Sequence, residues 1–182
     1  MKTSPKDSLP FSDDRVSLRR VSPADLAAFQ SYRNDVDLGR FQGWSPQGDQ
    51  EALVFIIEMA GAPLFQPDHW IQLAIEDTAS SSMIGDLGVF ISNDEQQAEI
   101  GFTLSRPAQG MGLATRAVRL AVALILRSTQ VRQIVGVTDT RNLASAKLLE
   151  RVGMQKRETL TAVFKGEPCH EHIYVISRQD AG

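Results

Sequence analysis

Short runs of alternating or continuous apolar residues, separated by polar clusters, predict strands along much of the chain. The predicted strands cover residues 15–21, 69–77, 82–92, 98–105 and 132–139, and two further strands follow residue 153. Short polar linkers that suit hairpins join the runs between residues 69 and 105. The middle of the chain is therefore predicted to form an antiparallel meander.

Apolar residues at a helical period predict four helices, at residues 22–35, 49–61, 113–129 and 142–153. Ser22 precedes Pro23, as an N-cap precedes the first helical residue, and Gly153 is placed to end the last helix. The helix at 49–61 carries its apolar stripe at Leu53, Ile56, Ile57 and Ala60.

The order of these elements predicts an α/β (α+β) fold with a mixed, mostly antiparallel sheet of about seven strands and helices on both faces. The chain has 182 residues, which suffices for one domain with a sizeable core. We expect this single domain at residues 15–182. Residues 1–14 lack the apolar segment of a signal peptide and are expected to form a disordered leader.

Charge and composition exclude several classes of function. A net charge of −3 and a pI of about 5.6 do not favour nucleic-acid binding, which needs an excess of Lys and Arg. The longest apolar run, residues 120–126, is too short to span a bilayer. Cys169 is the only cysteine, and no Cys/His spacing suggests a zinc site. We therefore expect a cytoplasmic protein without a metal, a nucleic-acid partner or a membrane partner.

A glycine-rich segment, Gln-Gly-Met-Gly-Leu-Ala-Thr at residues 109–115, lies between a predicted strand and a predicted helix. Gly110 and Gly112 allow the backbone to approach a ligand closely, and a helix N-terminus attracts anions. The spacing fits neither the dinucleotide-binding fingerprint nor the Walker phosphate loop. Two interpretations remain: a tight turn without a ligand, or a row of amides that binds a pyrophosphate, helped by the Thr115 hydroxyl.

Residues 109–114 resemble motif A of the GCN5-related N-acetyltransferase (GNAT) family, the loop that binds the pyrophosphate of coenzyme A. Residues 98–102 resemble the strand before that loop, and residues 142–154 resemble the family's motif B. The opening strand, the segment "FQGW" and the closing hairpin also resemble the branch typified by the ribosomal-protein N-terminal acetyltransferases RimJ and RimL. The resemblance covers nearly the whole chain from Arg15 and implies the GNAT fold.

This resemblance implies that acetyl-CoA is the cosubstrate and indicates which residues bind it. Backbone N–H groups at Phe102, Thr103 and Leu104 would polarise the thioester carbonyl. Asn142 would bind the pantetheine arm while also serving as an N-cap. The pyrophosphate would be held by Gln109, Gly110, Met111, Gly112, Leu113, Ala114 and Thr115.

Acetyl transfer to an amine needs a base for the amine proton and a proton donor for the leaving thiolate. The resemblance implies Glu99 as the base. It implies Ser145 as the acid, because Leu149 stands where many family members have Tyr. Ser145 would also lie against the cofactor. The alternative for Glu99 is a solvated strand residue without a catalytic role. The alternative for Ser145 is a plain hydroxyl on the helix surface. An α-amine, with a pKa of about 8, needs less help than a lysine, with a pKa of about 10.4.

Phe41, Trp44 and Tyr174 are the residues expected to contact the acceptor. A nucleophilic Cys169–His170 pair is conceivable, but the resemblance implies direct transfer without a covalent intermediate. The expected function is acetyl transfer to a protein N-terminal α-amine or to a small-molecule amine. The alternatives are an enzyme that acetylates antibiotics or polyamines and a CoA-binding module without catalysis. The chain is expected to be a monomer or a homodimer.

Overall fold

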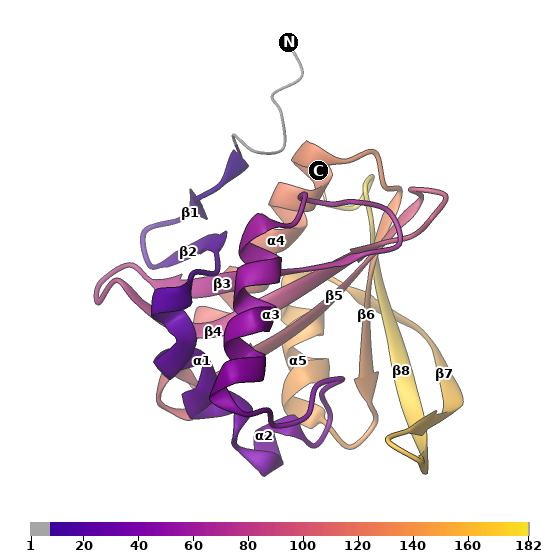
Figure 1. Ribbon diagram of the computed structural model, residues 1–182. Coiled ribbons are helices and arrows are strands. Elements are labelled where there is room, and N and C mark those ends of the chain that lie inside the picture. The colour runs from indigo at the N-terminus through magenta and orange to yellow at the C-terminus, as the bar shows by residue number, and fades with distance from the viewer. Residues whose placement is uncertain (1–7, 182) are drawn as a thin grey trace.

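A single mixed sheet organises the protein, as the computed structural model shows for residues 8–181 (Figure 1). In that part of the chain the sheet has eight strands in the order β1-β2-β3-β4-β5-β6-β8-β7. Every neighbouring pair is antiparallel except β5 and β6. The strands are β1 (Phe11–Ser12), β2 (Val16–Arg20), β3 (Trp70–Asp77), β4 (Ser82–Ile91), β5 (Gln97–Leu104), β6 (Gln133–Asp139), β7 (Gln155–Phe164) and β8 (Glu167–Ser177).

Helices cover both faces of this sheet (Figure 1). Helices α1 and α3 pack on one face, and α4 and α5 pack against each other on the opposite face. The larger core lies under α4, whose buried positions Ala117, Ala121 and Ile125 recur at helical spacing. The five helices in residues 8–181 are α1 (Leu26–Arg33), α2 (Val36–Gly39), α3 (Asp49–Gly61), α4 (Leu113–Ser128) and α5 (Leu143–Val152).

The predicted fold class, the meander and the helices on both faces are confirmed, and the sheet has one strand more than expected. The extra strand, β1, lies inside the segment that we expected to be a disordered leader, so that expectation is wrong for residues 8–14. Backbone pairing with β2 holds β1, and Arg116 binds Asp13 and Asp14 at 3.0 and 2.7 Å. Residues 1–7 lie outside the described part.

The apolar stripe predicted for α3 is only partly correct. Ile56 is buried, and Leu53 and Ala60 are half-buried, but Ile57 is 52% exposed. Helix α3 packs against α1, β3 and η2, a 3-10 turn at Pro23–Asp25, and only its residues on that side enter the smaller core. Periodicity alone does not show how wide a face the neighbouring elements cover.

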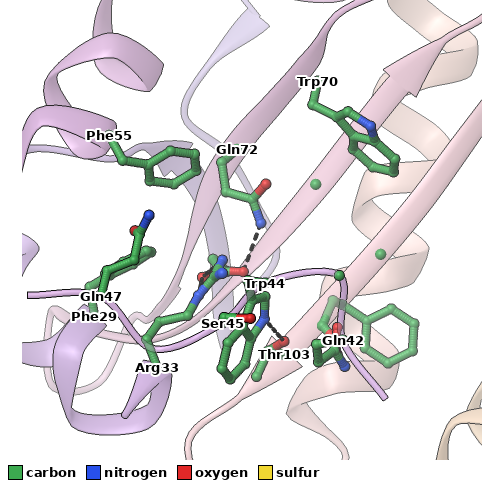
Figure 2. A pocket seen from close by; sticks show the side chains of 15 residues that line it. Phe29, Arg33, Gln42, Trp44, Ser45, Gln47, Phe55, Trp70, Gln72 and Thr103 are labelled. Carbon is green, nitrogen blue, oxygen red and sulfur yellow. Dashed lines mark hydrogen bonds and ion pairs between the residues drawn. The ribbon is translucent and has the colours of Figure 1, made fainter. Parts of the chain in front are cut away.

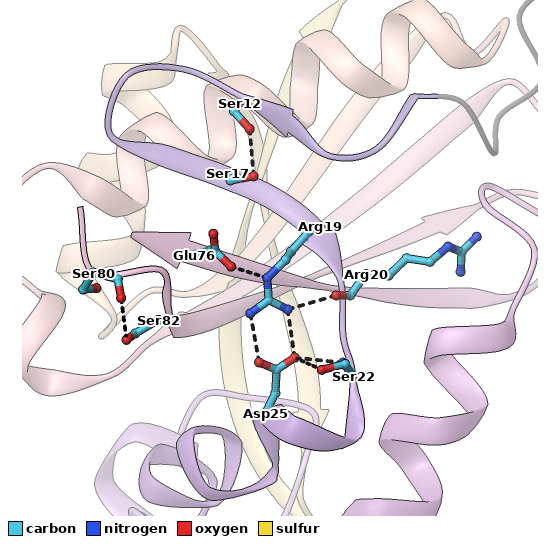
Figure 3. A network of polar contacts seen from close by, with 9 residues as sticks. All are labelled: Ser12, Ser17, Arg19, Arg20, Ser22, Asp25, Glu76, Ser80 and Ser82. Carbon is cyan, nitrogen blue, oxygen red and sulfur yellow. Dashed lines mark hydrogen bonds and ion pairs between the residues drawn. The ribbon is translucent and has the colours of Figure 1, made fainter. Parts of the chain in front are cut away.

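A polar network joins η2 to the first strands (Figure 3). The Arg19 guanidinium on β2 donates to the Asp25 carboxylate at 2.8 and 2.9 Å and also binds Glu76 on β3. Hydrogen bonds from Arg19 hold the pKa of Asp25 below its ordinary value, although burial opposes this shift. The network therefore fixes the start of α1 relative to the sheet.

The parallel pairing of β5 with β6 stops early, and this opens the sheet. Four residue pairs are formed, from Gln97 with Gln133 to Ile100 with Gly136. Beyond this point β5 continues to Leu104 along β4, while β6 continues to Asp139 along β8. The two strands therefore diverge and leave a splay that begins after Ile100.

Asp86 on β4 is the most deeply buried carboxylate beside this region, with a side chain 1% exposed. It accepts hydrogen bonds from Arg33 at 2.7 and 3.0 Å, from the Tyr32 hydroxyl at 2.6 Å and from Gln72 at 2.7 Å. Burial and the negative charge of Asp86 raise the pKa of Tyr32 well above its ordinary value. Asp86 thus ties α1 to strands β3 and β4.

The Asp86→Ala substitution should lower the free energy of unfolding by about 3 kcal/mol, because it leaves the Arg33 guanidinium buried without its counter-charge. Asp37→Ala, at a side chain 91% exposed, is the control and should change stability by about 0.5 kcal/mol or less. Urea denaturation followed by circular dichroism measures both. Equal losses in the two variants would contradict the structural role of Asp86.

Candidate active site

The backbone of β5 presents unpaired donors to the splay. At the end of β5, the Ser105 N–H donates to the Ile84 carbonyl at 2.8 Å. Hydrogen-bonded pairs alternate along an antiparallel ladder, so Phe102 and Leu104 turn their N–H and C=O groups away from β4. Since pairing with β6 has already ended, their N–H groups face the splay without a strand partner.

Two glutamine side chains occupy the carbonyl groups on the same edge of β5. Gln42 donates to the Phe102 carbonyl at 3.2 Å, and Gln109 donates to the Leu104 carbonyl at 3.0 Å. The carbonyls are therefore satisfied, whereas the N–H groups of Phe102 and Leu104 remain available to an oxygen atom of a ligand. Of the predicted carbonyl-polarising residues, Thr103 differs, because its N–H points toward β4.

The glycine loop lies at the end of the splay and leads into α4. Gly110 and Gly112 have φ of +79° and +75°, and a Cβ atom on either would meet no atom within 4 Å. The first hydrogen bond of α4 runs from the Arg116 N–H to the Gly112 carbonyl at 3.2 Å. The N–H groups of residues 113–115 therefore have no backbone acceptor and face outward at a helix N-terminus, which suits a pyrophosphate.

A small cleft of about 40 Å³ lies at the start of the splay, between β5, β6 and the N-terminus of α5. Asn142 is the N-cap of α5, and its side-chain oxygen accepts from the Ser145 N–H at 3.3 Å. The structure thus brings together four predicted site residues: Phe41, Phe102, Asn142 and Ser145. Leu149 also lines the cleft and packs against Gly136, where an added Cβ atom would lie 3.0 Å from the leucine side chain.

A larger cavity of about 550 Å³ opens on the other face of the sheet, beneath α1 and α3 (Figure 2). Trp44, one of the residues expected to contact the acceptor, lines this cavity, and its indole N–H donates to the Thr103 hydroxyl at 3.4 Å. The cavity and the cleft share three lining residues: Gln42, Gly101 and Phe102. A Cβ atom added to Gly101 would meet no atom within 4 Å, so open space lies beside the strand where the cavity and the cleft, the two hollows of the site, meet.

Glu99 lies two residues before Gly101 on β5 and points to the same face of the sheet. It is partly buried next to Phe90, whose ring lies 5.5 Å from that of Trp70 at the cavity wall. Burial raises the pKa of Glu99 above its ordinary value of 4.5, and the negative charge of Glu171 raises it further. The carboxylate accepts no hydrogen bond from the described residues. It does not itself line the cavity.

Tyr174 is not a substrate-binding residue, so that prediction is wrong. Its side chain is 1% exposed and lies in the larger core, and its hydroxyl donates to Glu150 of α5 at 2.9 Å. Tyr174 does point away from Ile173 and Val175, as alternation along β8 predicts. The face that it occupies is the one covered by α4 and α5, away from the cavity.

Several cavity residues were missed by the sequence analysis: Arg33, Gln42, Trp70, Gln72 and Asp86. One signal was present, since Asp86 interrupts an otherwise apolar predicted strand, where a carboxylate needs partners. The partner Arg33 is 53 residues away in the sequence, and nothing local connects the two.

No helix within residues 8–181 is long and apolar enough to cross a membrane. In the same part of the chain, no three His, Cys, Asp or Glu side chains are grouped as metal ligands would be.

Comparisons with known proteins agree with this geometry. A family model described as an acetyltransferase (GNAT) domain matches residues 15–155. YoaA of Bacillus subtilis (strain 168), an uncharacterized N-acetyltransferase, is 27% identical over 167 residues, which cover 90% of this chain and 93% of YoaA.

Two solved structures show the same fold. A GNAT-family acetyltransferase from Bacillus anthracis has a TM-score of 0.83 at 16% identity, and the match covers 93% of this chain and 98% of that one. RimL, described as a ribosomal L7/L12 α-N-protein acetyltransferase in complex with coenzyme A, has a TM-score of 0.77 at 18% identity, with 96% and 99% covered.

The matched family region contains the elements that build the site: β5, the glycine loop and α5. The match confirms the predicted enzyme class on more than half of the chain. The protein therefore belongs to the GNAT family of N-acetyltransferases, which take the acetyl group from acetyl-CoA.

Proposed function

We propose that this protein transfers the acetyl group directly to a protein N-terminal α-amine or a small-molecule amine, as a RimL-like member of its family. The observation that carries the proposal is the meeting of the two hollows at Gly101, beside the free N–H groups of Phe102 and Leu104. The thioester of acetyl-CoA in the splay and an amine in the cavity would come into contact at this point. The α-N-protein activity in the description of RimL supports the acceptor class.

The splay and the glycine loop fit acetyl-CoA, which supplies a thioester-activated acetyl group. The open space at Gly110 and Gly112 and the free N–H groups of residues 113–115 would hold its pyrophosphate. Asn142 would bind the pantetheine arm from the N-terminus of α5. The N–H groups of Phe102 and Leu104 would polarise the thioester carbonyl, because preorganised donors stabilise negative charge that develops on an oxygen.

Glu99 would accept the proton of the attacking amine, directly or through a water molecule. Its raised pKa makes it a stronger base than an ordinary carboxylate, and it lies on the cavity face of β5 beside Gly101. An α-amine with a pKa of about 8 is already partly neutral at pH 7, so one carboxylate suffices. A lysine acceptor would need more help.

Ser145 would protonate the leaving thiolate. Ser145 lines the cleft at the first turn of α5, and its hydroxyl donates to no described residue. Leu149 supplies no proton donor and instead packs against Gly136. Because a thiolate is a good leaving group, a serine or a water molecule is adequate for this step.

Thiol release from acetyl-CoA, measured with an N-terminal peptide as acceptor, tests the proposed function. Release that depends on the peptide, together with acetylation of its α-amine in the mass spectrum, is the expected result. Tight CoA binding without release on any amine would favour a binding module over an enzyme.

Gly101→Val should lower kcat/KM for the amine by about a hundredfold, because the branched side chain would fill the space where the two hollows meet. The fold should persist, since a Cβ at residue 101 meets no atom within 4 Å. Gly61→Val, at the end of α3, is the matched control: it has the same open surroundings, does not line the cavity and should retain activity. Equal activity of the two variants would contradict the passage at Gly101.

Glu99→Gln should lower kcat/KM at pH 7 by about tenfold or more and abolish the loss of activity that protonation of Glu99 causes at low pH. In the unsubstituted enzyme this limb should lie above 4.5, because the pKa of Glu99 is raised. Glu171→Gln is the companion variant: removing its charge should lower the pKa of Glu99 and move the limb to lower pH. The pH profile of kcat/KM measures both effects.

The stability of Glu99→Gln shows whether lost activity reflects chemistry or misfolding. A carboxyl whose pKa is raised by folding is stabilising below its unfolded pKa and loses that contribution as pH rises through the folded pKa. Replacing it with Gln should therefore not lower the melting temperature at pH 7. An unchanged acidic limb in a folded Glu99→Gln protein would rule out Glu99 as the base.

A further inference from the structure

We propose that the acceptor is a monoamine with an aromatic or large apolar body and a carbonyl or carboxylate oxygen beside the amine. This inference rests on the proposed function and specifies the substrate class of the same site. It excludes polycations such as polyamines and aminoglycosides as preferred acceptors. Three features of the cavity carry it: its aromatic walls, its neutralised charges and one free donor on Arg33.

The cavity walls are aromatic on several sides (Figure 2). They are formed by Phe29, Trp44, Phe55 and Trp70, which come from α1, the loop after α2, α3 and β3. A volume of about 550 Å³ lies within the range of small-molecule sites and accommodates an aromatic side chain with its backbone. Apolar burial and ring packing therefore favour a ligand with an aromatic or large apolar body.

The charges that line this cavity cancel each other. Arg33 and Asp86 are its only charged lining residues in the described chain, and they form a buried ion pair at 2.7 Å. The Asp86 carboxylate also accepts from Tyr32 and Gln72, so it has little capacity left for a ligand ammonium. Glu99, the next carboxylate along β5, is assigned to proton transfer. A polycation would therefore bring several charges into a site without free carboxylates, which is unfavourable.

Arg33 leaves one group without a protein partner. Its Nε and Nη2 atoms donate to Asp86, whereas Nη1 makes no hydrogen bond within residues 8–181. The guanidinium is held between the rings of Phe29 and Trp44, at 4.6 and 4.7 Å from their centroids, and its side chain is 8% exposed (Figure 2). Gln30 Oε1 is the only fully buried side-chain polar atom without a partner in the described residues, so Nη1 of Arg33 is open at the cavity wall and can donate to an oxygen acceptor of a ligand.

An α-amino acid residue combines these properties. Its amine would reach Gly101 and the splay, its carbonyl would accept from Arg33, and an aromatic or apolar side chain would lie among the rings. A peptide with an aromatic first residue and a free aromatic amino-acid amide share this chemistry. The structure thus assigns the cavity to the α-amine end of such molecules.

Both tryptophans of the chain, Trp44 and Trp70, line the cavity, so tryptophan fluorescence reports its occupancy without any need for catalysis. The probes are L-phenylalaninamide, phenethylamine, spermidine and kanamycin, each titrated against the full chain with CoA present. L-Phenylalaninamide should bind at least about tenfold more tightly than spermidine or kanamycin. Phenethylamine, which lacks the carbonyl, should bind about tenfold more weakly than L-phenylalaninamide.

Substitution of a wall residue connects the signal to this cavity. Trp70 is 46% exposed, so Trp70→Ala should fold, and it should raise the KM for L-phenylalaninamide at least about tenfold. Val163→Ala, at an apolar residue of β7 that is 74% exposed and does not line the cavity, is the control and should leave this KM unchanged. An equal KM in the two variants would overturn the assignment of the aromatic walls.

Thiol release measured in parallel separates this inference from the proposed function. Preferred turnover of spermidine or kanamycin would overturn the substrate class and leave acetyl transfer intact. Tight binding of L-phenylalaninamide without thiol release would support the ligand class and overturn the transfer to it. Absence of any fluorescence change with L-phenylalaninamide would overturn the inference.

Discussion

The early end of the pairing between β5 and β6 is the constraint on which the rest of the site depends. Pairing stops at Ile100 and Gly136, so β5 keeps its backbone N–H groups free where its neighbour β6 continues along β8. Side chains alternate along a strand while the edge groups remain in the sheet plane. One strand therefore serves two hollows: Glu99 and Gly101 point to the cavity face, and the N–H groups of Phe102 and Leu104 point into the splay.

Contacts from distant parts of the chain hold the segment of residues 41–47, which lines both the cleft and the cavity. Gln42 binds the edge of β5, and Trp44 stacks on Arg33, which is fixed by buried Asp86. From the opposite end of the chain, the Lys165 ammonium at the tip of the β7–β8 hairpin donates to the carbonyls of Gly39 and Trp44, at 2.9 and 2.8 Å. This segment is thus positioned by elements that are far apart in sequence, and its conformation depends on the whole fold.

The sequence predicted those parts of the molecule that local chemistry determines. The meander, the long helix and the glycine loop follow from periodicity and from positions that need positive φ, such as Gly112. Other features depend on which face a partner covers. Tyr174 was misassigned because alternation does not reveal which side of β8 meets α5, and the Arg33–Asp86 pair joins distant segments. The order of residues 8–14 depends on pairing with β2, which composition does not show.

Amide hydrogen exchange, followed by NMR with and without acetyl-CoA, tests the central claim most directly. If acetyl-CoA binds in the splay, the amides of Phe102 and Leu104 should exchange rapidly in the free protein. They should become protected when acetyl-CoA binds, together with the amides of residues 110–115. The amide of Thr103, which pairs with β4, should be protected in both states. Binding of acetyl-CoA that leaves Phe102 and Leu104 unprotected would contradict the account.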